Sequence, residues 1–164
     1  MTQTAFSAWV FLPFVIPLCL YVAFTDLAQM RITNPAVVTL ALIFVLLGPL
    51  ALPFEDYAWR LVHLPVMLVL GIVLNAAGVM GAGDAKFLAA AAPFLVLSDW
   101  QIMFMIYVTT LLTAYAAHRI ARATALRSLA PHWDSWEQGK KFPMGFALGP
   151  ALGLYLIMGA LYGA

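Results

Sequence analysis

The chain has 164 residues, of which 65% are hydrophobic and 9% are charged. Soluble domains carry about 25% charged residues on average, so this composition excludes an ordinary soluble domain and indicates an integral membrane protein. The formal net charge of +1 gives no basis for nucleic-acid binding through a basic surface. The sequence contains one cysteine, Cys19, which excludes an internal disulfide and a cysteine-rich zinc site, and we expect it to pack as a small apolar residue.

The apolar runs predict an all-α protein with six transmembrane helices, because a helix needs about 20 apolar residues to cross a membrane. The predicted spans are 6–25, 36–54, 61–79, 86–98, 101–118 and 143–163, with a cytoplasmic loop over 119–142, all within one membrane-embedded domain over residues 1–164. The N-terminus lacks the basic region of a cleavable signal peptide, so we expect the first span to be retained.

The basic residues predict the orientation. If the N-terminus and the C-terminus are outside, the inside loops hold seven of the eight Lys and Arg residues, namely Arg31, Lys86, Arg119, Arg122, Arg127, Lys140 and Lys141. The outside then holds only Arg60, in agreement with the rule that cytoplasmic loops are enriched in positive charge. This orientation puts both Asp26, at the end of the first span, and Asp84, before the fourth, at the cytoplasmic face.

Both aspartates adjoin apolar runs, where a carboxylate is costly and usually marks a functional site. The fourth span is short: a helix from Lys86 to Ser98 rises only about 20 Å, against a hydrocarbon core of about 30 Å. If this helix begins below the membrane surface, the preceding loop must line a wet cavity, because irregular backbone at that depth needs protein or water around it. We therefore expect Asp84 in a pocket.

A pair of neighbouring carboxylates predicts aspartic-protease chemistry. Two acids held close cannot both ionise, so one can activate a water while the other supplies a proton. The sequence has no Gly-x-Ser-x-Gly elbow and no His-Glu-x-x-His metal motif. The three histidines show no ligand spacing, and we read them as surface or interfacial residues and predict neither metal nor cofactor: His63, His118 and His132.

Glycine, proline and asparagine predict the turns around the aspartates. Gly81 and Gly83 can adopt positive φ and allow close approach of another backbone. Asn34 is predicted to cap the second helix, with Pro35 at its first position, so that 26–33 form a short cytoplasmic link. The last span is predicted to start near the site at 143–145, with a small-residue face for helix packing made by Gly145, Gly149 and Gly153.

The polar segment 118–142 alternates basic and apolar residues and leaves two readings open. It can be an amphipathic strip on the lipid headgroups, or a docking surface for a substrate or partner.

The stretch Gly81-Ala82-Gly83-Asp84-Ala85-Lys86 resembles the GxGDxK motif of the type IV prepilin peptidases, which are membrane aspartyl proteases. Asp26 followed by Arg31-Ile32-Thr33-Asn34 resembles the first aspartate of that family and its R-I-P-N stretch, with Thr33 in place of proline. The resemblance implies that Asp26 and Asp84 are the catalytic pair. It also implies that five residues shape the loops or contact substrate: Gly81, Gly83, Lys86, Arg31 and Asn34.

The resemblance further implies that the protein cuts the basic leader from prepilins or pseudopilins at the cytoplasmic face of the inner membrane. Long members of the family add a cytoplasmic domain with paired Cys-x-x-Cys motifs and methylate the new N-terminus. This chain is similar instead to the short peptidases of tight-adherence (Flp-type) pilus systems. We therefore expect a peptidase without methyltransferase activity, with the prepilin and the lipid bilayer as partners and without nucleic acid.

Two other functions compete with this interpretation. A transporter or channel subunit would use Asp26 and Asp84 as an ion or proton relay, and its acids would be spread through the membrane rather than gathered at one face. A non-catalytic subunit of a pilus or secretion machine would tolerate the loss of either carboxylate.

Overall fold

The computed structural model describes residues 1–139 and 141–164; Lys140, counted above among the inside basic residues, lies outside the described residues. The described chain is all-α, as predicted. Its α-helices are α1 (Ala5–Gln29), α2 (Asn34–Ala51), α3 (Phe54–Ala76), α4 (Ala82–Ala91), α5 (Trp100–Ala123) and α6 (Gly145–Tyr162). Five helical stretches are long and apolar enough to span a membrane: α1, α2, α3, the stretch Leu97–Ala123 that contains α5, and α6.

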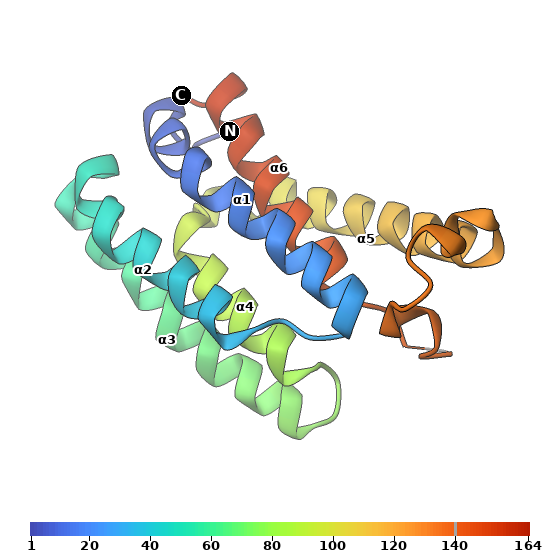
Figure 1. Cartoon of the computed structure of the whole chain (residues 1–164). Helices are drawn as coiled ribbons and strands as arrows, with labels where there is room; N and C mark the ends of the chain where they lie inside the picture. Colours follow the sequence, from blue (N-terminus) through green and yellow to red (C-terminus); the bar gives the residue numbers. More distant parts are fainter. Residues whose placement is uncertain (140) are drawn as a thin grey trace.

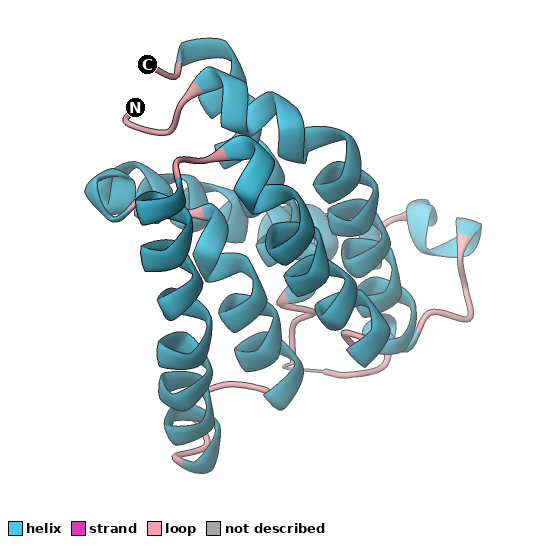
Figure 2. Ribbon diagram, turned by 90° about the vertical axis from the view of Figure 1, so that its left-hand side faces the viewer, coloured by secondary structure: helices cyan, strands magenta, loops and turns pink. Residues whose placement is uncertain are grey.

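Helix α4 does not reach the length of a membrane span. It covers ten residues and is followed by a short 3-10 turn, Ala92–Phe94. The sequence prediction of a shortened fourth helix is therefore confirmed, but its bounds are wrong: the helix begins at Ala82 and includes Asp84 in its first turn. In Figures 1 and 2 it lies among the longer helices, and α3 packs along it.

Several helices extend further into polar sequence than predicted. Helix α1 continues past Asp26 to Gln29 and ends at Met30, whose left-handed φ of 51° turns the chain toward α2. The link between α1 and α2 is therefore shorter than the predicted 26–33. Helix α3 starts at Phe54, not at 61, because acidic residues in its first turn interact favourably with the positive end of the helix dipole. Hydropathy marks the apolar part of a helix, and the backbone hydrogen bonds continue beyond it.

Helices α1 and α6 pack side by side through the predicted glycine face (Figure 1). A Cβ added at Gly149 would lie 2.5 Å from the Cys19 carbonyl oxygen, and one at Gly153 would lie 3.1 Å from Ile16 Cδ1. At Gly149 the two backbones can approach this closely only because α6 carries no side chain there, whereas at Gly153 the contact is with the end of a side chain. The contact matters for the site because α1 ends near Asp26 and α6 begins at Gly145.

An aromatic cluster fills the centre between α1, α2 and the turn after α4. Phe11, Phe44 and Phe94 are fully buried, with ring centroids 5.0 to 5.7 Å apart. Edge-to-face and offset contacts at these separations are favourable for aromatic rings. This cluster joins the α1–α6 pair to the group of α2, α3 and α4.

A polar network closes the end of the bundle that holds both termini (Figure 1). Asp99 is 3% exposed and accepts hydrogen bonds from the backbone N–H groups of Thr2 and Gln3, at 2.8 and 3.0 Å, and from the Tyr155 hydroxyl at 3.1 Å. The buried Arg60 donates to the Gln3 side-chain oxygen at 2.9 Å. The network ties the start of the chain to α3, α5 and α6.

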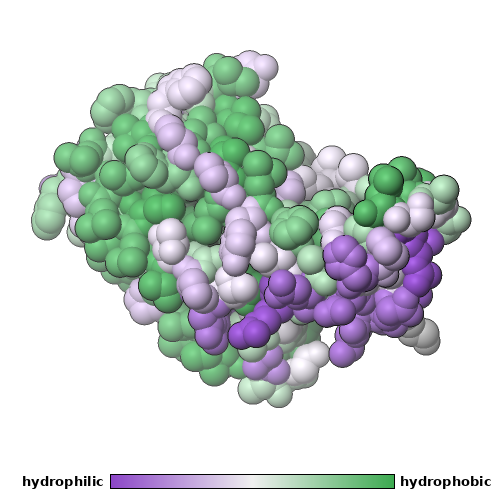
Figure 3. All heavy atoms as spheres, in the orientation of Figure 1, coloured by the Kyte–Doolittle hydropathy of each residue, from purple (hydrophilic) through white to green (hydrophobic). Residues whose placement is uncertain are grey.

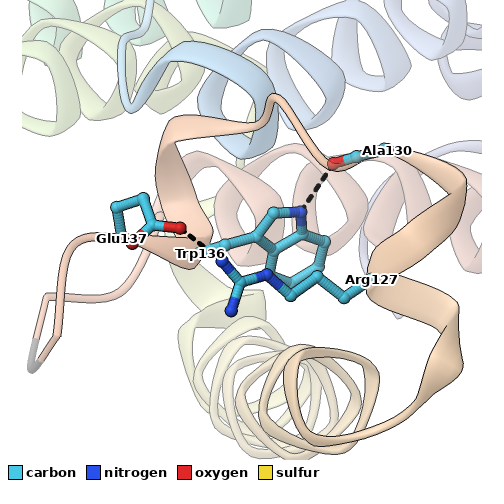
Figure 4. A network of polar contacts seen from close by, with 4 residues as sticks. All are labelled: Arg127, Ala130, Trp136 and Glu137. Carbon is cyan, nitrogen blue, oxygen red and sulfur yellow. Dashed lines mark hydrogen bonds and ion pairs between the residues drawn. The ribbon is translucent and has the colours of Figure 1, made fainter.

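The segment between α5 and α6 gathers hydrophilic residues at one side of the molecule (Figure 3, lower right). Its internal contacts include the Arg127–Glu137 ion pair and a 2.8 Å hydrogen bond from Trp136 Nε1 to the Ala130 carbonyl oxygen (Figure 4). The first part of the segment exposes Leu126 and Leu129, whereas Trp136 is buried. Only that first part therefore offers the apolar face expected of a strip on lipid headgroups.

His118 is buried, whereas the sequence suggested a position at the surface or an interface. It is 2% exposed, its ring stacks on Trp136 with centroids 5.0 Å apart, and Phe142 meets it edge-on at 5.8 Å. The segment folds back on α5 and brings these two rings over the histidine. His132 is exposed and His63 is half-buried, nearer to the expectation.

Candidate active site

A cavity of about 880 Å³ opens at the end of the bundle opposite the termini, where the three links α1–α2, α3–α4 and α5–α6 meet (Figure 1). Both predicted aspartates line it. The other polar or charged side chains in its wall are Arg31, Asn34, Lys86, Tyr107 and Lys141. The stretch 79–84 also lines the cavity, as expected for the loop before a helix that begins below the membrane surface.

Asp26 lies in the last turns of α1 and is 5% exposed. Its Oδ2 accepts a hydrogen bond of 2.6 Å from the backbone N–H of Gly145, the first residue of α6. A Cβ at Gly145 would lie 3.0 Å from both Cβ and Oδ2 of Asp26. The glycine therefore lets the α6 backbone come close enough to orient this carboxylate, and the prediction that α6 starts near the site is confirmed.

Asp84 lies in the first turn of α4, half-buried, and its carboxylate folds back over the start of its own helix. A Cβ at Gly81 would lie 2.8 Å from Asp84 Oδ2. Asp84 and Asp26 line the same cavity. Each of the two carboxylates therefore lies at a helix N-terminus, one at its own and one at that of α6, where the dipole favours negative charge.

The two glycines of the motif act by lacking a side chain, and neither uses the positive φ that glycine can adopt. Gly81 has a φ of −69° and Gly83 lies within α4; in the described residues, positive φ at glycine occurs at Gly78 and Gly139. A Cβ at Gly83 would lie 3.3 Å from Ile32 Cβ, so this glycine admits the α1–α2 link against α4. Close approach was predicted correctly, but an unusual backbone conformation is not needed for it.

Lys86 and Asn34 meet across the cavity rim. Lys86 Nζ donates a hydrogen bond of 3.1 Å to Asn34 Oδ1, which joins α4 to the start of α2. Asn34 is therefore not the helix cap that was predicted: Thr33 occupies the cap position without a side-chain bond, and Pro35 follows in the first turn. Arg31 is exposed at the cavity wall.

Two features of the cavity were not predicted from the sequence. Tyr107 contributes a phenol from α5, and the backbone N–H of Gly145 contributes the bond to Asp26. A tyrosine in an apolar run reads as a lipid-facing or packing residue, and a backbone donor carries no residue signature. The glycine before an apolar run was the available signal for the second.

The cavity wall joins two carboxylates, three cationic side chains and one phenol at a depth where the surrounding helices are apolar. Two carboxylates that share such a site repel one another when both are ionised, so the pair retains a proton more readily than isolated acids do. A water between them would meet a base and an acid together. This arrangement is suited to the hydrolysis of an amide bond.

Comparison with known proteins agrees with this chemistry. Residues 13–117, more than half of the chain, match the model of the type IV leader peptidase family. The comparisons with curated proteins and with solved structures give no match. The chain belongs to the type IV leader peptidase family and is an aspartic-type prepilin peptidase, a multi-pass membrane protein of the inner membrane that cleaves the leader peptides of prepilins.

Proposed function

We propose that Asp26 and Asp84 are the two catalytic carboxylates of this peptidase. The observation that carries the proposal is that both residues, 58 positions apart in the sequence and on different helices, lie in the wall of one cavity. Asp99, another carboxylate of the bundle, lies at the opposite end and is saturated with hydrogen bonds.

Hydrolysis follows from one protonated and one ionised carboxyl group. The ionised group takes a proton from water as the water oxygen bonds to the scissile carbonyl carbon. The protonated group gives its proton to the carbonyl oxygen, which forms a neutral gem-diol. The diol then returns a proton to the second carboxylate, the first gives its proton to the amide nitrogen, and the carbon–nitrogen bond breaks. Both groups end as they began.

The cavity wall suggests how a leader peptide is held. Gly81 and Gly83 lie in the cavity wall, and the Lys86–Asn34 bond holds α4 and α2 together at the rim. Arg31 lies in the same wall. We assign these five residues to shaping the loops or contacting the substrate.

We place the cavity at the cytoplasmic face, with both termini outside, and treat the whole chain as one membrane-embedded domain. The support is the charge distribution: Arg31, Lys86 and Lys141 line the cavity, whereas Arg60 lies at the end that holds the termini. Helix α4 would then be the sixth membrane segment, beginning near Asp84 within the inner leaflet and running toward the outer side. The pilin's apolar helix would remain in the bilayer, and pseudopilins would be processed in the same way.

We also propose that the reaction ends with cleavage. The paired Cys-x-x-Cys motifs that accompany methyltransferase activity in longer members need four cysteines, and this sequence contains one, Cys19, which is buried in α1.

The test is in vitro processing. The purified protein is incubated with candidate prepilins in detergent or liposomes, with S-adenosylmethionine present, and the products are weighed by mass spectrometry. We expect two peptides whose summed mass exceeds the substrate by one water. Cleavage that persists in both Asp26→Asn and Asp84→Asn would overturn the assignment of the pair, and a product heavier by one methyl group would overturn the peptidase-only proposal.

A further inference from the structure

The cavity wall contains a hydroxyl group, that of Tyr107, which has no role in the proposed mechanism. It lies in α5, a helix whose apolar stretch is almost entirely exposed on the surface of the bundle and so faces lipid over most of its length. Like Ile106 and Met103, Tyr107 is half-buried and packs against the core, but unlike them it lines the cavity and carries a hydroxyl. It therefore brings a polar group from the lipid-facing helix to the wall that holds Asp84.

The hydroxyl of Tyr107 has no hydrogen-bond partner within the described residues. Two other hydroxyl groups of the bundle do have partners: Thr110 Oγ1 donates to the Ile106 carbonyl oxygen at 2.6 Å, and the Tyr155 hydroxyl donates to Asp99. A tyrosine hydroxyl in an apolar region normally finds a partner. At Tyr107 that partner must come from the cavity, as water or as substrate.

Tyr107 also lies within electrostatic reach of Asp84, whose charge acts on the phenol. A substrate carbonyl group that is attacked by a water between Asp26 and Asp84 would therefore lie near this hydroxyl. Lys86, another donor close to Asp84, is already bonded to Asn34 at the rim.

We propose that Tyr107 is a further catalytic residue, whose phenol O–H donates a hydrogen bond to the scissile carbonyl oxygen as water adds to the carbonyl carbon. The inference rests on the proposed function of Asp26 and Asp84. The phenol keeps its proton throughout. It stabilises the negative charge that builds on the oxygen before the protonated carboxyl group delivers its proton, so its contribution is larger in the transition state than in the bound substrate.

The test is Tyr107→Phe, which removes the hydroxyl and leaves the ring to pack. We expect kcat to fall about 100-fold, the loss typical of one donor to a developing oxyanion, while KM and the thermal midpoint change little. Tyr115→Phe is the matched control, because Tyr115 lies on the same helix two turns further along, outside the cavity wall. We expect it to process prepilin at the wild-type rate.

Three readouts separate this inference from its alternatives. A wild-type kcat in Tyr107→Phe overturns it, and so does a raised KM at unchanged kcat, which would show that the phenol only binds substrate. A displaced pH profile with an unchanged maximal rate would show that Tyr107 acts through Asp84, which also overturns it. Asp84→Asn in the same assay reports on the proposed pair, so an inactive Asp84→Asn beside a fully active Tyr107→Phe removes this inference alone.

Discussion

Asp99 and Asp26 are both buried carboxylates, and they lie at opposite ends of the same bundle in different surroundings. Asp99 accepts bonds from two backbone N–H groups and two hydroxyls, so its lone pairs are occupied by the protein. Asp26 accepts one short bond from Gly145 and otherwise faces a cavity that it shares with Asp84. One end uses a carboxylate to hold the structure together, and the other keeps its carboxylates available to water and substrate.

The largest effect is expected at the cavity end. Asp26→Asn and Asp84→Asn each remove one member of the proposed acid–base pair, so prepilin processing should fall by at least about 1000-fold. The measurement is the single-turnover rate of leader cleavage by purified protein. Membrane insertion and the thermal midpoint serve as controls, and a variant that retains more than a few per cent of the wild-type rate would contradict the assignment of that residue.

Gly81→Ala tests whether the position of the Asp84 carboxylate matters. The added Cβ would lie 2.8 Å from Oδ2, so the carboxylate must move. We expect kcat to fall about 10- to 100-fold, because small displacements of a reacting group are costly in rate, with little change in stability. Gly153→Ala is the control, since its Cβ meets a flexible end of Ile16 far from the cavity. Equal rates in the two variants would count against the prediction.

Asp99→Asn tests the structural end. An amide in place of the carboxylate weakens the bonds from Thr2 and Gln3, so we expect a loss of about 1 to 3 kcal/mol of stability. Processing by the folded fraction should stay within about twofold of wild type, since the residue is remote from the reaction. The measurements are thermal unfolding in detergent and cleavage at low temperature. A stable but inactive Asp99→Asn would show that the two ends are coupled.

The smallest effect is expected at the rim. Breaking the exposed Lys86–Asn34 bond should slow processing by about two- to fivefold. A double-mutant cycle with Lys86→Met and Asn34→Ala measures it. If the bond is what matters, the double variant is no slower than either single variant, whereas independent effects that multiply would show that each residue contacts the substrate separately.

Sequence reasoning succeeded where a residue type was costly for its surroundings. Aspartates beside apolar runs, a fourth run too short to cross, and glycines at four-residue spacing all predicted features that the structure contains: Asp26 and Asp84 in one cavity, the short α4, and the α1–α6 contact. Each pattern has few physical explanations in a membrane protein. Each therefore predicted a structural feature without knowledge of the contacts between distant residues.

The rest depended on contacts between distant parts of the chain. Asn34 has the sequence features of a helix cap, but Lys86, 52 positions away, takes its side chain. His118 is buried because Trp136 and Phe142 fold over it. Tyr107, unlike the exposed aromatic residues of α5, is half-buried and lines the cavity. Local sequence patterns do not show which distant residues come into contact in the folded chain. These assignments were therefore missed or wrong.

The meeting of Asp26 and Asp84 can be measured directly by cross-linking. In a Cys19→Ala background, Asp26→Cys and Asp84→Cys are combined and treated in native membranes with a short thiol-specific bifunctional reagent, beside a control pair of Asp84→Cys and Asp99→Cys, which lie at opposite ends of the bundle. The structure predicts an intramolecular cross-link in the first pair and none in the control. The shared catalytic centre would be contradicted if both cysteines of the first pair react with single-site thiol reagents but never cross-link to each other, with or without bound prepilin.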